Sequence, residues 1–247
     1  MRYTGIPMGD AQLSTLSDGA IWYLVFLLST TLHEAAHAFT AYLGGDDTAS
    51  AAGVMTADPT PHIMRSPVGM VLAPIVSFVY AGWMMGWASV PYDPHWGARH
   101  PRKQALMSAA GPAANLLLAI LALIAIKACL SAGAFIAPES VDFSRVVAPA
   151  DAAAGGMWGA LAILLSVTLN LNVLLCAFNL LPVPPLDGSG VLAGLWPNNR
   201  LTAFYRDTQE SAMIGLLAAW ILFGAIAGPL FSAVLMVVHP DVGYSAR

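Results

Sequence analysis

Charged side chains are scarce in this sequence of 247 residues: 10% are charged and 57% are hydrophobic. A soluble domain carries about 25% charged residues, so too few charges are present to cover a water-facing surface. The mean hydropathy of +0.68 agrees with this. The composition predicts an integral protein of the lipid bilayer, and the length suits a single membrane domain over 1–247.

Cysteine is almost absent as well, with only Cys129 and Cys176 in the chain. Both lie in apolar stretches, so we expect buried small side chains and neither a disulfide framework nor a CxxC site. Basic residues form no cluster and the net charge is −4, which argues against a nucleic-acid partner. The polar N-terminal stretch 1–20 lacks the layout of a signal peptide.

Long apolar segments are abundant, and four of them meet the length of about 20 residues that a membrane helix needs. These four run roughly over 18–43, 104–130, 157–181 and 211–238. A fifth segment, 68–90, is as apolar but contains Pro74 and three glycines. It could be a span, a broken helix or a re-entrant element. We therefore expect an all-α polytopic membrane protein with four to five transmembrane helices and a candidate re-entrant segment.

A group of ionisable residues lies within the first apolar segment, where His33, Glu34 and His37 spell H-E-x-x-H. Positions i and i+4 share one face of a helix, so both imidazoles can bind one metal ion while Glu34 reaches a nearby water. Random placement of the six histidines and three glutamates would give this pattern in roughly two of a thousand such chains. Ionisable groups inside a membrane helix are also costly and usually functional. The pattern therefore predicts a zinc site rather than a structural polar cluster.

Two histidines do not complete a catalytic zinc site, which uses three protein ligands and keeps a fourth position for water. The better candidate for the third ligand is Asp187, in the stretch FNLLPVPPLDGSG after segment 157–181. Taken alone this stretch indicates only a helix exit, because proline stops a helix and Asp-Gly favours a turn. The other candidates are Glu139 and Glu210, which lie outside the apolar segments. The residues by themselves leave this choice open.

Two motifs taken together resemble the site-2 protease family of intramembrane zinc metalloproteases. They are His33-Glu34-x-x-His37 in an apolar helix and, far downstream, Asn179-x-x-Pro182-x-x-x-Leu186-Asp187-Gly188. The stretch AGPAAN, from Ala110 to Asn115, is similar to the compact bacterial branch of that family. The resemblance extends from about Leu28 to Val191.

This resemblance implies an enzyme that hydrolyses peptide bonds within or near the transmembrane segments of membrane proteins, as in regulated intramembrane proteolysis. It implies one zinc ion per chain, a transmembrane protein as substrate and no set oligomeric state. It also implies that the zinc ligands are His33, His37 and Asp187 and that the catalytic base is Glu34. Asn179 and Pro182 would hold the substrate backbone.

The depth of the ligands constrains the path of segment 68–90. If that segment crossed the membrane fully, Asp187 would emerge where the first helix begins, whereas His33 lies about 15 residues along that helix, roughly 22 Å. If the segment dips in and returns, His37 and Asp187 both lie toward the C-terminal ends of parallel helices. We therefore expect that 68–90 does not cross as one regular helix. Six Arg and Lys residues then lie on the active-site face and four on the other, which favours a cytoplasmic active-site face in the cell membrane.

Two further features bear on the site. Residues 49–59 show the alternation and bounding proline of a short strand, and the resemblance implies a small β element near the active site that could hold an extended substrate. For Asn115 we expect an interhelical hydrogen bond rather than a role in chemistry.

Other classes of membrane protein compete with the protease interpretation. A membrane zinc peptidase could use a glutamate as third ligand. A non-catalytic zinc-binding or transport protein would not explain Glu34 or the motif around Asp187. A histidine-box oxygenase would need more histidines than the six in the chain.

Overall fold

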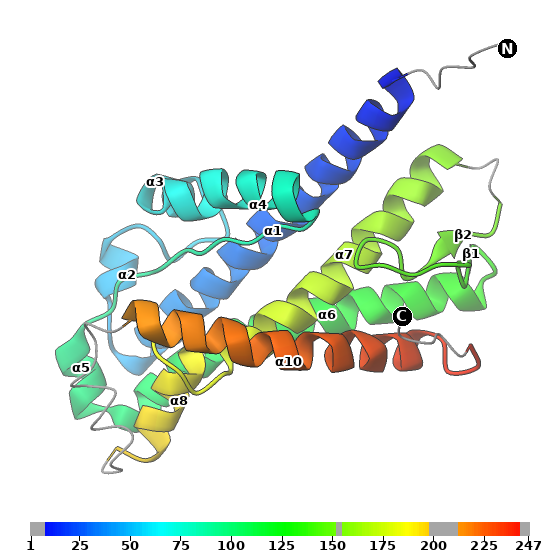
Figure 1. Cartoon of the computed structure of the whole chain (residues 1–247). Coiled ribbons are helices and arrows are strands. Elements are labelled where there is room, and N and C mark those ends of the chain that lie inside the picture. Colours follow the sequence, from blue (N-terminus) through cyan, green and yellow to red (C-terminus); the bar gives the residue numbers. More distant parts are fainter. Residues whose placement is uncertain (1–7, 152–154, 198–211, 243–247) are drawn as a thin grey trace, which may run out of the picture.

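The computed structural model describes residues 8–151, 155–197 and 212–242, and almost every described element is helical (Figure 1). The long helices are α1 (Met8–Gly44), α6 (Pro101–Ser131), α7 (Gly155–Asn179) and α10 (Ala212–Val238). The short ones are α2 (Thr48–Ala51), α3 (Pro59–Arg65), the π-helical η1 (Val68–Leu72), α4 (Ala73–Ala81), α5 (Pro94–Arg99) and α8 (Asp187–Leu195). Two short strands, β1 (Phe135–Ile136) and β2 (Ala148–Pro149), complete the order.

Within the described part of the chain, three helices are long and apolar enough to cross a membrane: 101–131, 156–179 and 215–238. The bent pair 59–65 and 68–81 would bring the number to four. Helix α1, with 37 residues, is longer than these three but is not among the candidate spans. The predicted all-α polytopic membrane fold is confirmed.

Segment 68–90 is not one regular helix, as predicted. Its helical part ends at Ala81, and Gly82 adopts a left-handed conformation with φ of 74°, which favours glycine. The preceding helix α3 is bent away from the η1–α4 pair by 112°. After Gly82 the chain folds back, because the N–H of Trp87 donates to the carbonyl of Gly69 at 3.1 Å. This close approach requires a glycine at 69, where a side chain would collide with Trp87.

The small β element exists, but it lies away from the region where we expected it. Strands β1 and β2 pair in antiparallel register after α6 has ended. Residues 49–59 instead form α2 and turns, so the prediction of a strand there was wrong. Part of the physical reason is local: the Asp46 side chain accepts a hydrogen bond from the N–H of Thr48 at 3.0 Å, and the alanines that follow favour helix over strand.

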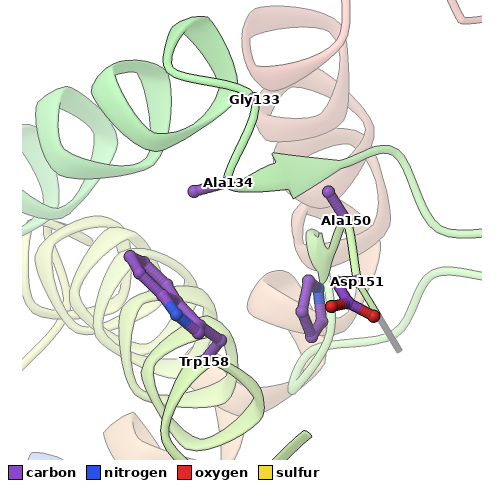
Figure 2. Close-up of a pocket in the computed structure, with 6 residues that line it drawn as sticks. Gly133, Ala134, Ala150, Asp151 and Trp158 are labelled. Carbon is purple, nitrogen blue, oxygen red and sulfur yellow. The ribbon is translucent and has the colours of Figure 1, made fainter. Parts of the chain in front are cut away.

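A pocket of about 210 Å³ lies beside this sheet (Figure 2). Its lining residues are Gly133, Ala134, Pro149, Ala150, Asp151 and Trp158. Figure 2 shows Trp158 on one side and Asp151 on the other. None of these residues belongs to the chemical motifs of the sequence.

Apolar packing sets the relative positions of α1, α6 and α7. Phe26 of α1 packs against Leu171 of α7, and Ala119 of α6 belongs to one cluster with Leu169 of α7. Helix α6 also contacts α8, so it lies against both elements that carry the predicted ligands. Between these apolar clusters the interface becomes polar, and there the site is built.

Candidate metal centre

Helices α1 and α8 bring His33, His37 and Asp187 together, although about 150 residues separate them in sequence. One ligand atom from each residue lies within 4.8 Å of the others. The Nε2 atoms of His33 and His37 are 3.0 Å apart. The Asp187 carboxylate lies 3.1 Å from Nε2 of His33 and 3.3 Å from Nε2 of His37. Both histidines are 7% exposed. The group expected from the sequence is therefore assembled inside the helix bundle.

Asp187 is held in place by the way the chain leaves α7 and enters α8. Helix α7 ends at Asn179, and the proline-containing turn that follows leads into α8, whose first residue is Asp187. Leu181 and Leu186 bury this turn in an apolar cluster. A side chain at Gly188 would collide with the carbonyl oxygens of the turn. The glycine after the aspartate thus allows α8 to begin directly against the end of α7.

Helix α6 covers the cluster from the other side. Its Gly111 lies against the two imidazoles, and a side chain at this position would collide with Nε2 of both His33 and His37. Asn115 lies one turn further along the same face of α6. The GPAAN stretch thus supplies the surface on which the two histidines rest.

Each histidine has a partner for its other ring nitrogen. Nδ1 of His37 lies 2.7 Å from the carbonyl oxygen of Met107, and Nδ1 of His33 lies 2.6 Å from Oδ1 of Asn115. A backbone carbonyl only accepts, so Nδ1 of His37 carries a ring proton, and in a neutral imidazole its Nε2 presents a lone pair to the cluster. Metal-binding histidines are held in this manner.

The donor set and its spacing fit a zinc ion. Two histidines with one carboxylate is a combination that catalytic zinc sites use, and ligand atoms around a tetrahedral zinc lie about 3.3 Å apart at usual bond lengths. The observed separations are 3.0 to 3.3 Å. Oδ2 of Asp187 is buried without a hydrogen-bond partner in the described part of the protein, and Gly111 keeps the space beside the nitrogens free of a side chain.

The other predicted site residues lie on the same two stretches of chain. Glu34 follows His33 on α1 and is 6% exposed. Asn179 is the last residue of α7, half-buried, and its Nδ2 donates to the carbonyl of Leu175 at 2.9 Å. Pro182 is exposed in the turn before α8.

The rival third ligands do not join the cluster. Glu139 lies in the connection between β1 and β2 and is not part of the candidate metal-binding group found among the described residues. Glu210 falls outside the described residues.

Sequence reasoning missed several residues that support the site. The expected interhelical hydrogen bond of Asn115 is present, to Asn172, but Asn115 also contacts His33 directly. Gly111, Asn172 and the carbonyl of Met107 were not foreseen. The only local signal was that Gly111 and Asn115 are four residues apart, so they share one helical face as His33 and His37 do.

Comparison with known families agrees with this geometry. The model of Peptidase family M50 matches residues 21–223. The chain belongs to this family. Family M50 is the site-2 protease family, so the predicted intramembrane zinc metalloprotease is confirmed, with zinc as its cofactor.

Individual proteins are also similar to the chain. "Putative zinc metalloprotease YwhC" of Bacillus subtilis is 32% identical over 179 residues, which cover 71% of this chain and 69% of YwhC. "Putative zinc metalloprotease Rip2" of Mycolicibacterium smegmatis is 32% identical over 167 residues, covering 68% of this chain and 54% of Rip2. The chain thus matches about half the length of Rip2. No solved structure is significantly similar to it.

Proposed function

We propose that this M50 protein cleaves transmembrane protein substrates within or near their membrane segments, using one zinc ion held by His33, His37 and Asp187. The observation that carries the proposal is the cluster of these three residues inside an apolar helix bundle, with both histidines buried and Asp187 partly buried. A site among candidate membrane spans suits a peptide bond that is itself in the membrane.

In this proposal Glu34 is the catalytic base. When bound, zinc supplies a Lewis acid that polarises the scissile carbonyl and makes water more acidic. Glu34 accepts one proton from water while the water oxygen bonds to the carbonyl carbon. The same carboxyl group then gives the proton to the amide nitrogen as the C–N bond breaks. The position of Glu34 next to His33 on α1, buried with it, supports this role.

Asn179 and Pro182 are proposed to hold the substrate backbone beside the cluster. Both lie in the stretch that joins α7 to Asp187, so a substrate that reaches the carboxylate passes this stretch. An amide side chain there can donate to the carbonyl oxygen as negative charge develops on it. A helical substrate must first unwind locally, because its carbonyls are otherwise occupied by backbone hydrogen bonds.

The active-site end of the bundle is proposed to face the cytoplasm. The end of α1 and the start of α6 meet there, and Nζ of Lys103 donates to the carbonyl of Gly44 at 2.9 Å. Arg99 and Arg102 lie on the same stretch. An excess of basic residues marks the cytoplasmic side of membrane proteins, and this supports a multi-pass protein of the cell membrane with the site on that side.

Zinc content and proteolysis of the purified protein test the ligand set. His33→Ala and Asp187→Ala should each lose zinc and cleavage of a single-span substrate in liposomes, because two protein ligands are left. Glu139→Gln is the matched control and should keep both. Full zinc occupancy in Asp187→Ala would overturn the proposed ligand set.

A further inference from the structure

A buried chain of polar side chains joins three helices directly behind His33. Asn115 of α6 and Asn172 of α7 are both 0% exposed, and Ser29 of α1 is 2% exposed. Nδ2 of Asn115 donates to Oδ1 of Asn172 at 2.8 Å. Burying amide groups is costly unless they are hydrogen-bonded, so the orientation of each amide in this network is strongly constrained.

The orientation of Asn172 follows from a backbone carbonyl. Its side-chain amide has a donor end and an acceptor end, and either could in principle face a given neighbour. Nδ2 of Asn172 donates at 2.9 Å to the carbonyl of Thr168 and at 2.9 Å to Oγ of Ser29. Because the carbonyl only accepts, the NH₂ end must face Thr168. The oxygen end of Asn172 therefore faces Asn115.

The same reasoning passes from Asn172 to His33. An acceptor at Asn172 requires the NH₂ end of Asn115, which also lies 3.5 Å from the carbonyl of Ser29. The oxygen end of Asn115 then faces Nδ1 of His33 at 2.6 Å. Since that oxygen only accepts, Nδ1 carries the ring proton. In a neutral imidazole the other nitrogen, Nε2, then has a free lone pair.

We propose that Asn115 and Asn172 are positioning residues that hold His33 in the tautomer in which Nε2 binds zinc. The inference rests on the ligand role of His33 in the proposed function. His37 has a backbone carbonyl as its partner, which cannot be reversed. The partner of His33 is an amide side chain that could turn its NH₂ group toward Nδ1, and Asn172 prevents this.

Substitutions separate the need for an acceptor at residue 115 from the need for Asn172 to orient that acceptor. Asn115→Ala removes the acceptor for Nδ1, and loss of such a partner costs typically about 10- to 100-fold in metal affinity. Asn115→Asp supplies an oxygen in either orientation, so it should retain most of the zinc affinity. Asn172→Leu leaves the amide of Asn115 free to turn. The loss of zinc affinity in Asn172→Leu should be larger than in Asn115→Asp and smaller than in Asn115→Ala.

A double variant gives the sharpest test. In the Asn115→Asp background, Asn172→Leu should cost no zinc affinity, because a carboxylate needs no neighbour to choose its orientation. If the two asparagines only stabilised the fold, the effect of Asn172→Leu would persist in that background. Coupling of this kind between neighbouring residues is what a double-mutant cycle measures.

Asn170 provides a matched control on the same helix. It is 2% exposed, and its Nδ2 donates to the carbonyl of Phe143 at 2.9 Å. It therefore resembles Asn172 in residue type, burial and its bond to a backbone carbonyl, but no hydrogen bond among the described residues joins it to the His33 network. Asn170→Ala should lower the thermal midpoint and leave zinc affinity unchanged.

The experiment measures apparent zinc affinity by competition with a chelator on the full-length protein in detergent, with thermal unfolding of the same samples. Zinc affinity should be highest in the wild type, lower in Asn172→Leu and lowest in Asn115→Ala. Wild-type affinity in Asn115→Ala, or an equal loss in Asn170→Ala, would overturn the positioning role. His33→Ala is measured in parallel: if it keeps its zinc, the ligand assignment itself fails. If it loses zinc while Asn115→Ala keeps it, the ligand assignment stands and the positioning role fails.

Discussion

Replacing Gly111 by alanine tests whether α6 must lack a side chain beside the two proposed zinc ligands, His33 and His37. A Cβ at this position would lie 2.5 Å from Nε2 of His33 and closer still to that of His37, whereas ordinary contact begins near 3.4 Å. Each nitrogen would therefore have to retreat by about 1 Å. Metal–ligand distances tolerate deviations of about 0.2 Å, so the two imidazoles could not both remain at bonding distance.

The expected effect on zinc is larger than the effect on folding. Overpacking a core lowers the free energy of unfolding by about 1–3 kcal/mol. Alanine has a higher helix propensity than glycine, which offsets about 1 kcal/mol of this loss. Zinc affinity should fall at least 10- to 100-fold, the loss that follows when ligand support is removed. Gly159→Ala is the control, because a Cβ at that position on α7 meets nothing within 4 Å.

Chelator competition and thermal unfolding, each measured on both variants, check this prediction. Gly159→Ala should bind zinc like the wild type. If Gly111→Ala does so as well, zinc binding does not require the close approach of α6 to the histidines.

Three further predictions follow from the site and its surroundings. Glu34→Gln should keep zinc and lower cleavage by about 10²–10⁴-fold, while Asn179→Ala should cost less; near-normal cleavage by Glu34→Gln would exclude it as the base. Burial opposes ionisation of Asp46, but hydrogen bonds from the Thr48 side chain and from the N–H groups of Asp93 and Thr48 outweigh it and lower the pKa of Asp46. The stability that Asp46 contributes is thus present above its unfolded pKa of about 3.9 and is lost as pH falls through the lower folded value, so wild type and Asp46→Ala should differ in thermal midpoint at pH 7 and converge in acid. Single cysteines at Arg65 and at Arg99, in a background without the native cysteines, should label from the same side of the membrane in intact cells; labelling from opposite sides would mean that 68–90 crosses it.

Local patterns were sufficient for the helices and for the histidine pair. The lengths of the apolar segments predicted α6, α7 and α10 to within a few residues, because the bilayer thickness sets the length of a spanning helix. The pair His33 and His37 converges because four residues make about one turn of α1. The glycines and Pro74 predicted the break in 68–90.

Local patterns failed where a weak pattern met a specific contact. The alternation in 49–59 favoured a strand, but its small residues have little strand preference. The Asp46 side chain, which accepts from Thr48 and from the N–H of Asp93 at 2.8 Å, decides the local structure instead. Asp93 lies far along the chain, so no window around residues 49–59 contains this contact.

By itself the sequence determined the membrane class, the helices and one face of α1 with two imidazoles and a carboxylate, since these depend on composition and on spacing within one helix. Only the tertiary structure decided which residue completes the cluster and which ring nitrogens face it. Asp187 reaches the histidines because α6 packs against both α1 and α8, with Gly111 and Gly188 permitting the close approach. The proton on His33 is set by Asn115, Asn172 and a carbonyl of α7. These are contacts between helices that are distant in sequence, and their geometry arises only when the bundle has packed.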